Sequence, residues 1–319
     1  MDFGASARIR PGVAGAAGII CLVVAVMILA AGCAGRRKVV ESYPAEDAAD
    51  TEIDGVRIRF LDFNRNVPDL PIVYIHGYSG TGFEAFFFQD NFATKHRVIA
   101  PDLPGSGWSD KPDIEYTLEY MVRFVSRFVD TLGIRRFYLI GHSMGGQIAV
   151  TYAAQNPERV ERLVLIAPYG LHDEAGRLLS FLSRTGSLVD AGMRLHSRLL
   201  LDLVVDLNVF HDPDRIPPDF VDYVSISTFD TQNGLGALAS ITRNIITETD
   251  VEDVLSRIEM PTLIIWGADD QVLSFRYAAD FDSGIRGSRL VAIPSCGHMP
   301  HLECQAETAA AIETFLTTP

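Results

Sequence analysis

The stretch LIGHSMGGQIAV, Leu139 to Val150, places one serine between two apolar runs, with a glycine two residues before it and another two residues after it. Glycine and serine are also common in ordinary turns, so this pattern alone fits a strand-to-helix connection without any chemistry. The run before the serine is typical of a buried strand, and the run after it is compatible with a helix. Ser143 therefore occupies the strand, turn and helix setting of a nucleophile elbow.

The rest of the chain alternates short apolar strands with longer helical segments. Strands are expected in VRIRFLDFN, PIVYIHG, RVIAPD, RFYLIGHS, RLVLIAP, PTLIIWG and RLVAIPS, most of which end in turn residues or in residues capable of catalysis. Residues 117–133 carry apolar side chains on one helical face, and Gly133 ends that helix. This alternation predicts an α/β fold, a mostly parallel sheet with helices on both faces.

The alternation stops between residues 169 and 250. This interval is strongly apolar and helix-compatible, and three prolines interrupt it in HDPDRIPPDF. We interpret residues 169–250 as a helical cap inserted into the sheet domain, whose two parts are then residues 51–168 and 251–319. Most of the apolar stripe in the cap is expected to pack internally, and part of it is expected to face a cleft.

Composition and net charge limit the classes of ligand that the chain is expected to bind. The chain has 319 residues, of which 48% are hydrophobic and 21% are charged, as is usual for a folded domain with a large core. The formal net charge of −14 argues against a nucleic-acid partner, because such a partner requires a basic surface. Uncharged or weakly polar small molecules fit better as substrates.

The N-terminus differs from the rest of the chain. Two arginines, Arg8 and Arg10, precede a run without charge from Pro11 to Gly35. Such a run is typical of a secretory signal or of an uncleaved membrane anchor, and both would bring the chain to a membrane. The basic residues 36–38 would favour a cytoplasmic C-terminal side if the run stayed as a helix.

The small residues before Cys33 resemble the cleavage box of bacterial lipoproteins, in which the cysteine is lipidated and becomes the new N-terminus. Ala30 departs from the leucine most common at its position. We expect residues 1–32 to be a signal segment or anchor, and Cys33 to carry lipid. Residues 33–50 would then tether the enzyme to the outer side of a bacterial cell membrane.

A serine hydroxyl becomes an effective nucleophile only when a base takes its proton and an acid orients that base. Asp270 follows an apolar strand, and His298 follows the last predicted strand. The nucleophile, the acid and the base therefore occur along the chain in the order that catalytic triads on a parallel α/β sheet have. Loops at the carboxyl ends of parallel strands converge, so we expect the three side chains to meet. The backbone N–H groups of Tyr78 and Met144 are expected to form the oxyanion hole.

These motifs together resemble the α/β-hydrolase superfamily, over roughly residues 51–319 apart from the cap. They are HG at 76–77, DLPGSG at 102–107, GHSMGG at 141–146, WGADD at 266–270 and GH at 297–298. The resemblance implies the same catalytic roles for the residues named above, and it implies no cofactor. One departure is Ser274, where many relatives have proline.

Neighbouring residues offer alternatives. Asp269 could replace Asp270 as the acid, but the spacing from the preceding glycine in the family favours Asp270. His142, beside the serine, is expected to point away from the base position. His76 is expected to orient the oxyanion loop, and Asp102 to support the turn after its strand.

The segment CGHMPHLEC, residues 296–304, contains every common type of zinc ligand. A zinc site would use His298, the only histidine suitably placed as base, and the spacing lacks the paired CxxC signature, so we expect no metal. Cys296 and Cys304 could form a disulfide in an oxidising compartment or remain two buried thiols, and their spacing leaves both open.

The expected function is that of a carboxylesterase or lipase that works through an acyl-enzyme. The apolar cap and the membrane attachment favour a substrate with an apolar acyl chain. The first alternative is a hydrolase of carbon–carbon bonds in ring-cleavage products, whose relatives commonly have tryptophan where this chain has Met299. The second alternative is an inactive hydrolase fold that binds a ligand at the membrane.

Overall fold

The structure is a computed structural model that describes residues 43–44, 46–171, 209–217, 219–220, 223–224, 231–247 and 251–318. The expected signal segment or anchor at 1–32, Cys33 and much of the expected cap, residues 172–208, lie outside the described residues. Within the described part, no helix combines the length and the apolar character needed to cross a membrane.

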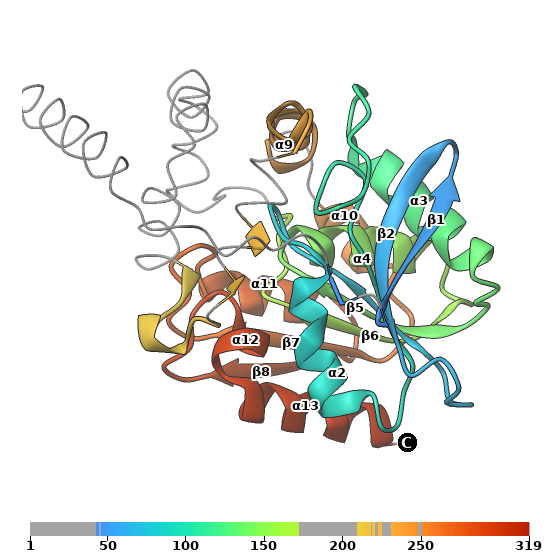
Figure 1. Cartoon of the computed structure of the whole chain (residues 1–319). Coiled ribbons are helices and arrows are strands. Elements are labelled where there is room, and N and C mark those ends of the chain that lie inside the picture. The colour runs from blue at the N-terminus through green and yellow to red at the C-terminus, as the bar shows by residue number, and fades with distance from the viewer. Residues whose placement is uncertain are drawn as a thin grey trace, which may run out of the picture.

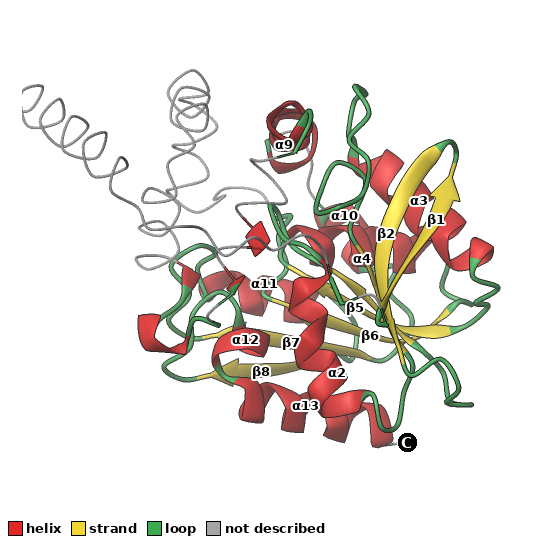
Figure 2. Ribbon diagram, in the orientation of Figure 1, coloured by secondary structure: helices red, strands yellow, loops and turns green. Residues whose placement is uncertain are grey.

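An eight-stranded sheet runs through the described part of the chain in the order β1-β2-β4-β3-β5-β6-β7-β8 (Figures 1 and 2). The strands are β1 (Ala48–Ile53), β2 (Val56–Phe63), β3 (Ile72–Ile75), β4 (Val98–Pro101), β5 (Phe137–His142), β6 (Val160–Ile166), β7 (Thr262–Gly267) and β8 (Arg289–Ile293). Strand β2 pairs antiparallel with β1 and β4, and the pairs from β4 to β8 are parallel. The mostly parallel sheet predicted from the sequence is confirmed.

Helices cover both faces of this sheet (Figure 2). They are η1 (Gly82–Ala85), α2 (Phe86–Phe92), α3 (Leu118–Thr131), α4 (Met144–Gln155), η3 (Pro213–Arg215), α9 (Gly234–Ile241), the π-helical η4 (Thr242–Ile246), α10 (Glu252–Leu255), α11 (Arg276–Gly284), α12 (Pro300–Glu303) and α13 (Gln305–Thr317). Alternate residues of β3 point to opposite faces of the sheet. Val73 packs in the apolar core on one face, which is covered by α3, α4, α10 and α11. Tyr74 packs in the core on the other face, which is covered by α2, α12 and α13.

Helix α3 follows directly from the sequence pattern. Thr117 caps its N-terminus, with the side chain accepting a hydrogen bond from the Tyr120 N–H at 3.1 Å. Its apolar face is buried, and Gly133 follows the helix with a φ of 69°. Only glycine adopts this left-handed conformation without steric cost, which explains why the helix ends there.

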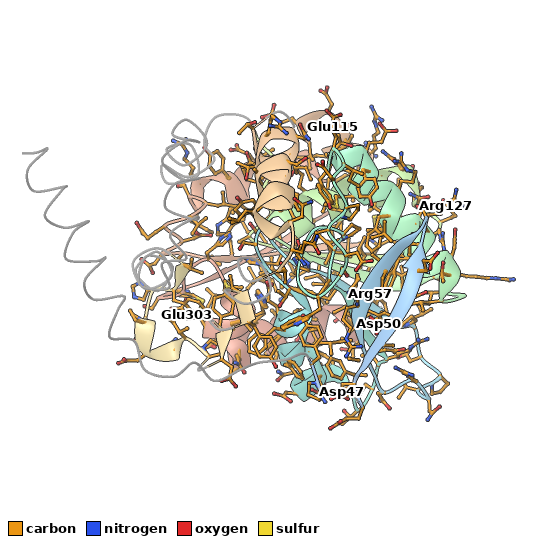
Figure 3. All side chains as sticks on the ribbon, turned by 45° about the horizontal axis from the view of Figure 1, so that its top comes forward. Asp47, Asp50, Arg57, Glu115, Arg127 and Glu303 are labelled. Atoms are coloured by element: carbon orange, nitrogen blue, oxygen red, sulfur yellow. A yellow bond between two sulfur atoms is a disulfide. The ribbon has the colours of Figure 1, made fainter. Side chains whose placement is uncertain are left out.

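Strand β1 corrects the expected tether at residues 33–50. Its first residues, Ala48 to Asp50, belong to that stretch, yet they pair with β2. β1 is an edge strand whose side chains are mostly partly or fully exposed and whose sequence, AADTEI, is half polar or charged, so it lacks the apolar signal of the inner strands. Asp50 accepts hydrogen bonds from Arg57 and Arg59 of β2, at 3.0 and 2.7 Å (Figure 3).

The described remainder of the expected cap includes helix α9 and the adjoining η4, which packs against it. Ala237, Ile241 and Ile245 of these helices join the same apolar core as α3 and α4. The boundaries 169–250 remain a prediction, because so much of the interval lies outside the described residues.

Candidate active site

Ser143 lies at the sharp turn between β5 and α4. Its φ of 52° and ψ of −120° are rarely adopted by residues other than glycine and cost about 1–3 kcal/mol. Hydrogen bonds hold the backbone there: the Ser143 N–H donates to the Ile166 carbonyl at 3.0 Å, and the Ser143 carbonyl accepts from Tyr169 N–H at 3.0 Å. The strained backbone is typical of a serine presented at a nucleophile elbow.

The glycines around the serine are required by close packing. A Cβ atom on Gly145 would lie 2.1 Å from the Ile75 carbonyl oxygen, at the end of β3. A Cβ atom on Gly141 would lie 2.4 Å from the Gly145 carbonyl oxygen. Real side chains do not tolerate such contacts with backbone, so both positions must be glycine for the turn to pack against β3.

The predicted acid and base are in contact. His298 Nδ1 lies 2.8 Å from Asp270 Oδ2, and both side chains are buried. The other oxygen, Asp270 Oδ1, accepts hydrogen bonds from the N–H groups of Val272 and Leu273, each at 2.8 Å. The carboxylate can only accept from the imidazole, so the proton lies on Nδ1 and the lone pair on Nε2, as a general base requires.

The structure brings this pair to the elbow. The Nε2 atom of His142, the residue before Ser143, lies 3.0 Å from the carbonyl oxygen of His298. The rings of His142 and His298 have centroids 4.9 Å apart. The alternative acid, Asp269, is exposed and accepts a hydrogen bond from the Ser295 N–H at 3.0 Å instead.

The two expected oxyanion donors flank the serine. Met144 is the first residue of α4, where a helix has unpaired N–H groups. Tyr78 follows Gly77, on which a Cβ atom would lie 3.2 Å from the Cβ of Ser143. The Tyr78 hydroxyl pairs with Thr242 Oγ1 at 2.7 Å, and burial raises its pKa to about 12, so the phenol is neutral.

His76 fixes the backbone of the oxyanion loop, in agreement with its expected role. Its Nδ1 donates to the Gly77 carbonyl at 2.8 Å, and its Nε2 accepts from the Leu103 N–H at 3.0 Å. Both ring nitrogens are therefore used, which leaves none for proton transfer with a substrate.

Asp102 supports the turn after β4 and also holds the N-terminal segment. It is fully buried and accepts hydrogen bonds from Gly82 N–H at 2.6 Å, Trp108 N–H at 2.8 Å and the Tyr43 hydroxyl at 2.6 Å. The Tyr43 ring also packs against Trp108 and Tyr223, with centroids 4.7 and 5.8 Å apart. Tyr43 is thus held to the core by Asp102, which follows the carboxyl end of β4. The candidate site lies at the same end of the parallel strands.

The loop that carries His298 is closed by a disulfide. Cys296 and Cys304 are joined, with Cα atoms 6.3 Å apart, so the bridge left open by the sequence is present in the structure. The backbone N–H of His298 donates to the Val209 carbonyl at 2.8 Å. The loop that carries His298 is therefore held both within itself and by Val209, a described residue near the middle of the expected cap.

Glu303 also holds this loop in place, through hydrogen bonds that could not be predicted from the sequence. It is buried and accepts a hydrogen bond from Gly297 N–H at 2.6 Å with Oε2 and from Asp212 N–H at 2.7 Å with Oε1. Figure 3 labels it beside the pale yellow segment that contains Asp212. One carboxylate thus links the residue before the base to Asp212, which lies 91 positions before Glu303 in the sequence.

We expect Glu303→Ala to lower the free energy of unfolding by about 1–3 kcal/mol, because the buried N–H group of Gly297 and the partly buried N–H group of Asp212 lose a charged acceptor. Turnover should also fall, since the loop holding His298 is loosened. Urea denaturation and kcat measurement test this, with Glu303→Gln as the milder variant that retains one amide oxygen. Wild-type stability in Glu303→Ala would contradict the role of the carboxylate.

Two groups of side chains have the composition of a metal site. In the first, Glu84, His142 and His301 are buried with their ligand atoms within 4.8 Å of one another. The second comprises Cys296, Glu303 and Cys304, and its two sulfurs are already joined to each other. Glu84 could have been noticed as a single acid in the apolar run GFEAFFF, although that pattern does not indicate which residues it contacts.

The fold and this geometry define a class of protein. Residues 71–304 match the family described as the alpha/beta hydrolase fold, and the chain belongs to that family. The strained serine between a strand and a helix, with a histidine–aspartate pair beside it, agrees with a hydrolase of the α/β type.

The proteins to which this chain is similar have different named activities. The chain is 27% identical over 287 residues to the dihydrolipoyllysine-residue acetyltransferase component of the acetoin cleaving system of Cupriavidus necator, covering 86% of this chain and 72% of that one. It is 29% identical over 263 residues to a 2-hydroxymuconate semialdehyde hydrolase of Pseudomonas sp. strain CF600, covering 77% and 86%. A solved bacterial membrane phospholipase A is 25% identical, with a TM-score of 0.71 and coverage of 95% and 94%.

Proposed function

We propose that the chain hydrolyses carboxylic esters through an acyl-enzyme, with Ser143 as nucleophile, His298 as base and Asp270 as acid. The observation that carries this proposal is the 2.8 Å hydrogen bond between His298 Nδ1 and Asp270 Oδ2 beside the strained Ser143. The proposal is for a carboxylesterase or lipase that needs no cofactor.

In the first half of the reaction, His298 Nε2 takes the proton of the Ser143 hydroxyl as its oxygen attacks the ester carbonyl. The negative charge on the carbonyl oxygen is held by the N–H groups of Tyr78 and Met144. His298 then gives the proton to the alcohol oxygen, the carbon–oxygen bond breaks, and the acyl group stays on Ser143. Asp270 stabilises the imidazolium throughout.

In the second half, water takes the place of the alcohol. His298 Nε2 removes a proton from water as its oxygen attacks the acyl carbon, and the same two N–H groups hold the new oxyanion. The proton then returns to the oxygen of Ser143 as the acyl bond breaks. The carboxylic acid leaves, and the enzyme is restored.

Support for an apolar acyl group comes from two sources. One is the similarity to a membrane phospholipase A along nearly the whole chain. The other is the apolar sequence of the expected cap. A carbon–carbon bond hydrolase is the second candidate, and the 29% identity to a 2-hydroxymuconate semialdehyde hydrolase favours it.

We expect kcat/KM on p-nitrophenyl esters to rise with acyl length and then level off where the acyl pocket ends. Each CH₂ group that is fully buried contributes about 0.8 kcal/mol, or roughly a fourfold gain in kcat/KM. Initial rates on esters of increasing length test this, with the Ser143→Ala protein as the blank for each substrate.

Other profiles would select other functions. A flat series with activity only on acetyl esters would point to a small-ester enzyme. Greater kcat/KM on a vinylogous 1,5-diketone than on every ester would select the carbon–carbon hydrolase. Binding of these compounds without any turnover would favour the inactive, ligand-binding alternative.

We further propose that Cys33 is lipidated and holds the enzyme on the outer side of a bacterial membrane. The uncharged run before it supports this, and the Cys296–Cys304 disulfide suits an oxidising compartment. Tyr43, which is anchored, lies ten positions after Cys33, which allows at most about 35 Å of extended chain. The domain would therefore stay close to the membrane surface.

Cys33→Ser should block processing and leave a longer precursor in the membrane fraction. Cys21→Ser is the matched control, because cleavage before Cys33 removes residue 21 and its loss should change nothing. Stable attachment needs more than one acyl chain, so mass spectrometry of the wild type should find several. An intact Met1 in the mature wild-type protein would instead support the uncleaved anchor.

A further inference from the structure

A buried polar cluster lies directly behind the elbow and has no part in the proton transfers proposed above. It consists of Tyr74, Glu84, His142 and His301, all at most 3% exposed. Glu84 Oε2 is its centre: His142 Nδ1 lies at 3.2 Å, His301 Nε2 lies at 3.3 Å, and the Tyr74 hydroxyl donates to the same oxygen. The cluster joins η1, β3, the elbow and α12.

The hydrogen atoms on His142 follow from its two partners. Its Nε2 lies 3.0 Å from the His298 carbonyl oxygen, which can only accept, so Nε2 carries a proton. In a neutral imidazole the other nitrogen, Nδ1, then carries only a lone pair. That lone pair would face the Glu84 carboxylate at 3.2 Å, which is repulsive unless a proton lies between the two atoms.

We propose that Glu84 and His142 share one proton, and that Glu84 thereby acts as a positioning residue for the catalytic histidine. The shared proton fixes the plane of the His142 ring. The Nε2–H of the fixed ring donates a hydrogen bond to the carbonyl oxygen of His298. This bond fixes the position of the His298 backbone and therefore of the base. This inference rests on the proposed function, because it concerns the same base.

The surroundings of Glu84 favour a carboxylate in this role. Burial alone would raise the pKa of Glu84, but the hydrogen bonds from His142 and His301 outweigh burial and hold the pKa below its ordinary value, while burial lowers the pKa of His142 to about 4. Taken separately, these shifts would leave an ionised Glu84 facing a neutral His142, so the shared proton is assigned from the 3.2 Å contact between Nδ1 and Oε2 and not from the pKa shifts. A metal ion bound to Glu84, His142 and His301 would also remove the repulsion. The Tyr74 hydroxyl already donates to the oxygen that such an ion would use, so a proton is the simpler occupant.

The kinetic test compares Glu84→Ala with Glu84→Gln. We expect the alanine variant to lose about 10- to 100-fold in kcat with little change in KM, because the base is misplaced while the substrate site is intact. The glutamine variant should stay within about threefold of wild type, since its amide N–H can donate to His142 Nδ1 and replace the shared proton.

The matched control is Asp62→Ala, which removes another buried carboxylate far from the site. Asp62 on β2 accepts two hydrogen bonds from Arg97, at 2.7 and 2.8 Å. This variant should be less stable than the wild type but keep its kcat. A kcat loss in Glu84→Ala without one in Asp62→Ala separates positioning from general destabilisation.

Proton NMR tests the shared proton without turnover, so its failure is distinct from failure of the proposed function. Two downfield imidazole resonances are expected, one from His298 with Asp270 and one from His142 with Glu84. Asp270→Asn should remove only the first, and Glu84→Gln only the second. Of the Glu84 variants this measurement uses only Glu84→Gln, so it still applies if Glu84→Ala does not fold.

Several results would overturn the proposal. A folded Glu84→Ala protein with wild-type kcat would do so, as would equal losses of kcat in the alanine and glutamine variants. Absence of the second resonance from the Asp270→Asn protein would exclude the shared proton. One equivalent of a transition metal in the purified wild type, lost in Glu84→Gln, would replace the proton with a metal ion.

Discussion

Ser143→Ala is expected to abolish ester hydrolysis and to leave the fold intact. Loss of a nucleophile in such a triad costs about 10³-fold or more in turnover, and the residual rate comes from the oxyanion hole and substrate binding. The elbow should persist, because its shape depends on backbone hydrogen bonds of residue 143 and on the flanking Gly141 and Gly145. Steady-state kinetics and a thermal unfolding curve test both parts.

Ser295→Ala is the matched control for this variant. Ser295 has a φ of 51°, close to the 52° of Ser143, but it is exposed, so the same change of side chain is made on a similar backbone. It should retain wild-type turnover. Near-normal hydrolysis by a folded Ser143→Ala protein would exclude Ser143 as the nucleophile.

The second large effect is expected for Asp270→Asn. The oxygen of the new amide should keep the hydrogen bonds from Val272 and Leu273, which places its NH₂ group against His298 Nδ1. His298 must then accept at Nδ1 and carry its proton on Nε2, the wrong tautomer for a base. A loss of about 10³- to 10⁴-fold in kcat is expected, as in serine hydrolases with this change.

Asp269→Asn is the control for Asp270→Asn. Asp269 is exposed, and its carboxylate accepts a hydrogen bond from the Ser295 N–H of the loop backbone, so its variant should stay within about threefold of wild type. The opposite order of effects would make Asp269 the acid. Small and equal effects would contradict the proposed triad.

Much of the fold could be predicted because the inner strands are buried on both sides. A parallel strand covered by two helical layers must be apolar throughout, and that requirement is visible as short runs in the sequence. The contact between the proposed acid Asp270 and the proposed base His298 could be predicted for a related reason, since both residues follow such strands and the ends of parallel strands meet at one edge. The edge strand β1 pairs with one neighbour only in the described sheet, and its side chains are largely exposed, so its sequence shows no apolar run.

The supporting residues could not be predicted, because their roles depend on distant partners. Glu84 contacts His142 and His301, which lie 58 and 217 positions away in the sequence. Tyr43 binds Asp102 across 59 positions. No local pattern encodes such pairs, since each is formed only when the sheet has brought the segments together.

The bridge between Cys296 and Cys304 also bears on how the protein is produced. In a host whose cytoplasm is reducing, the newly made chain keeps two thiols at these positions. The loop that carries His298 then loses its covalent closure and is held by hydrogen bonds, among them those of Glu303, of His142 and of the Val209 carbonyl. The specific activity of a preparation should therefore follow the redox conditions under which the chain was folded, even when its purity is the same.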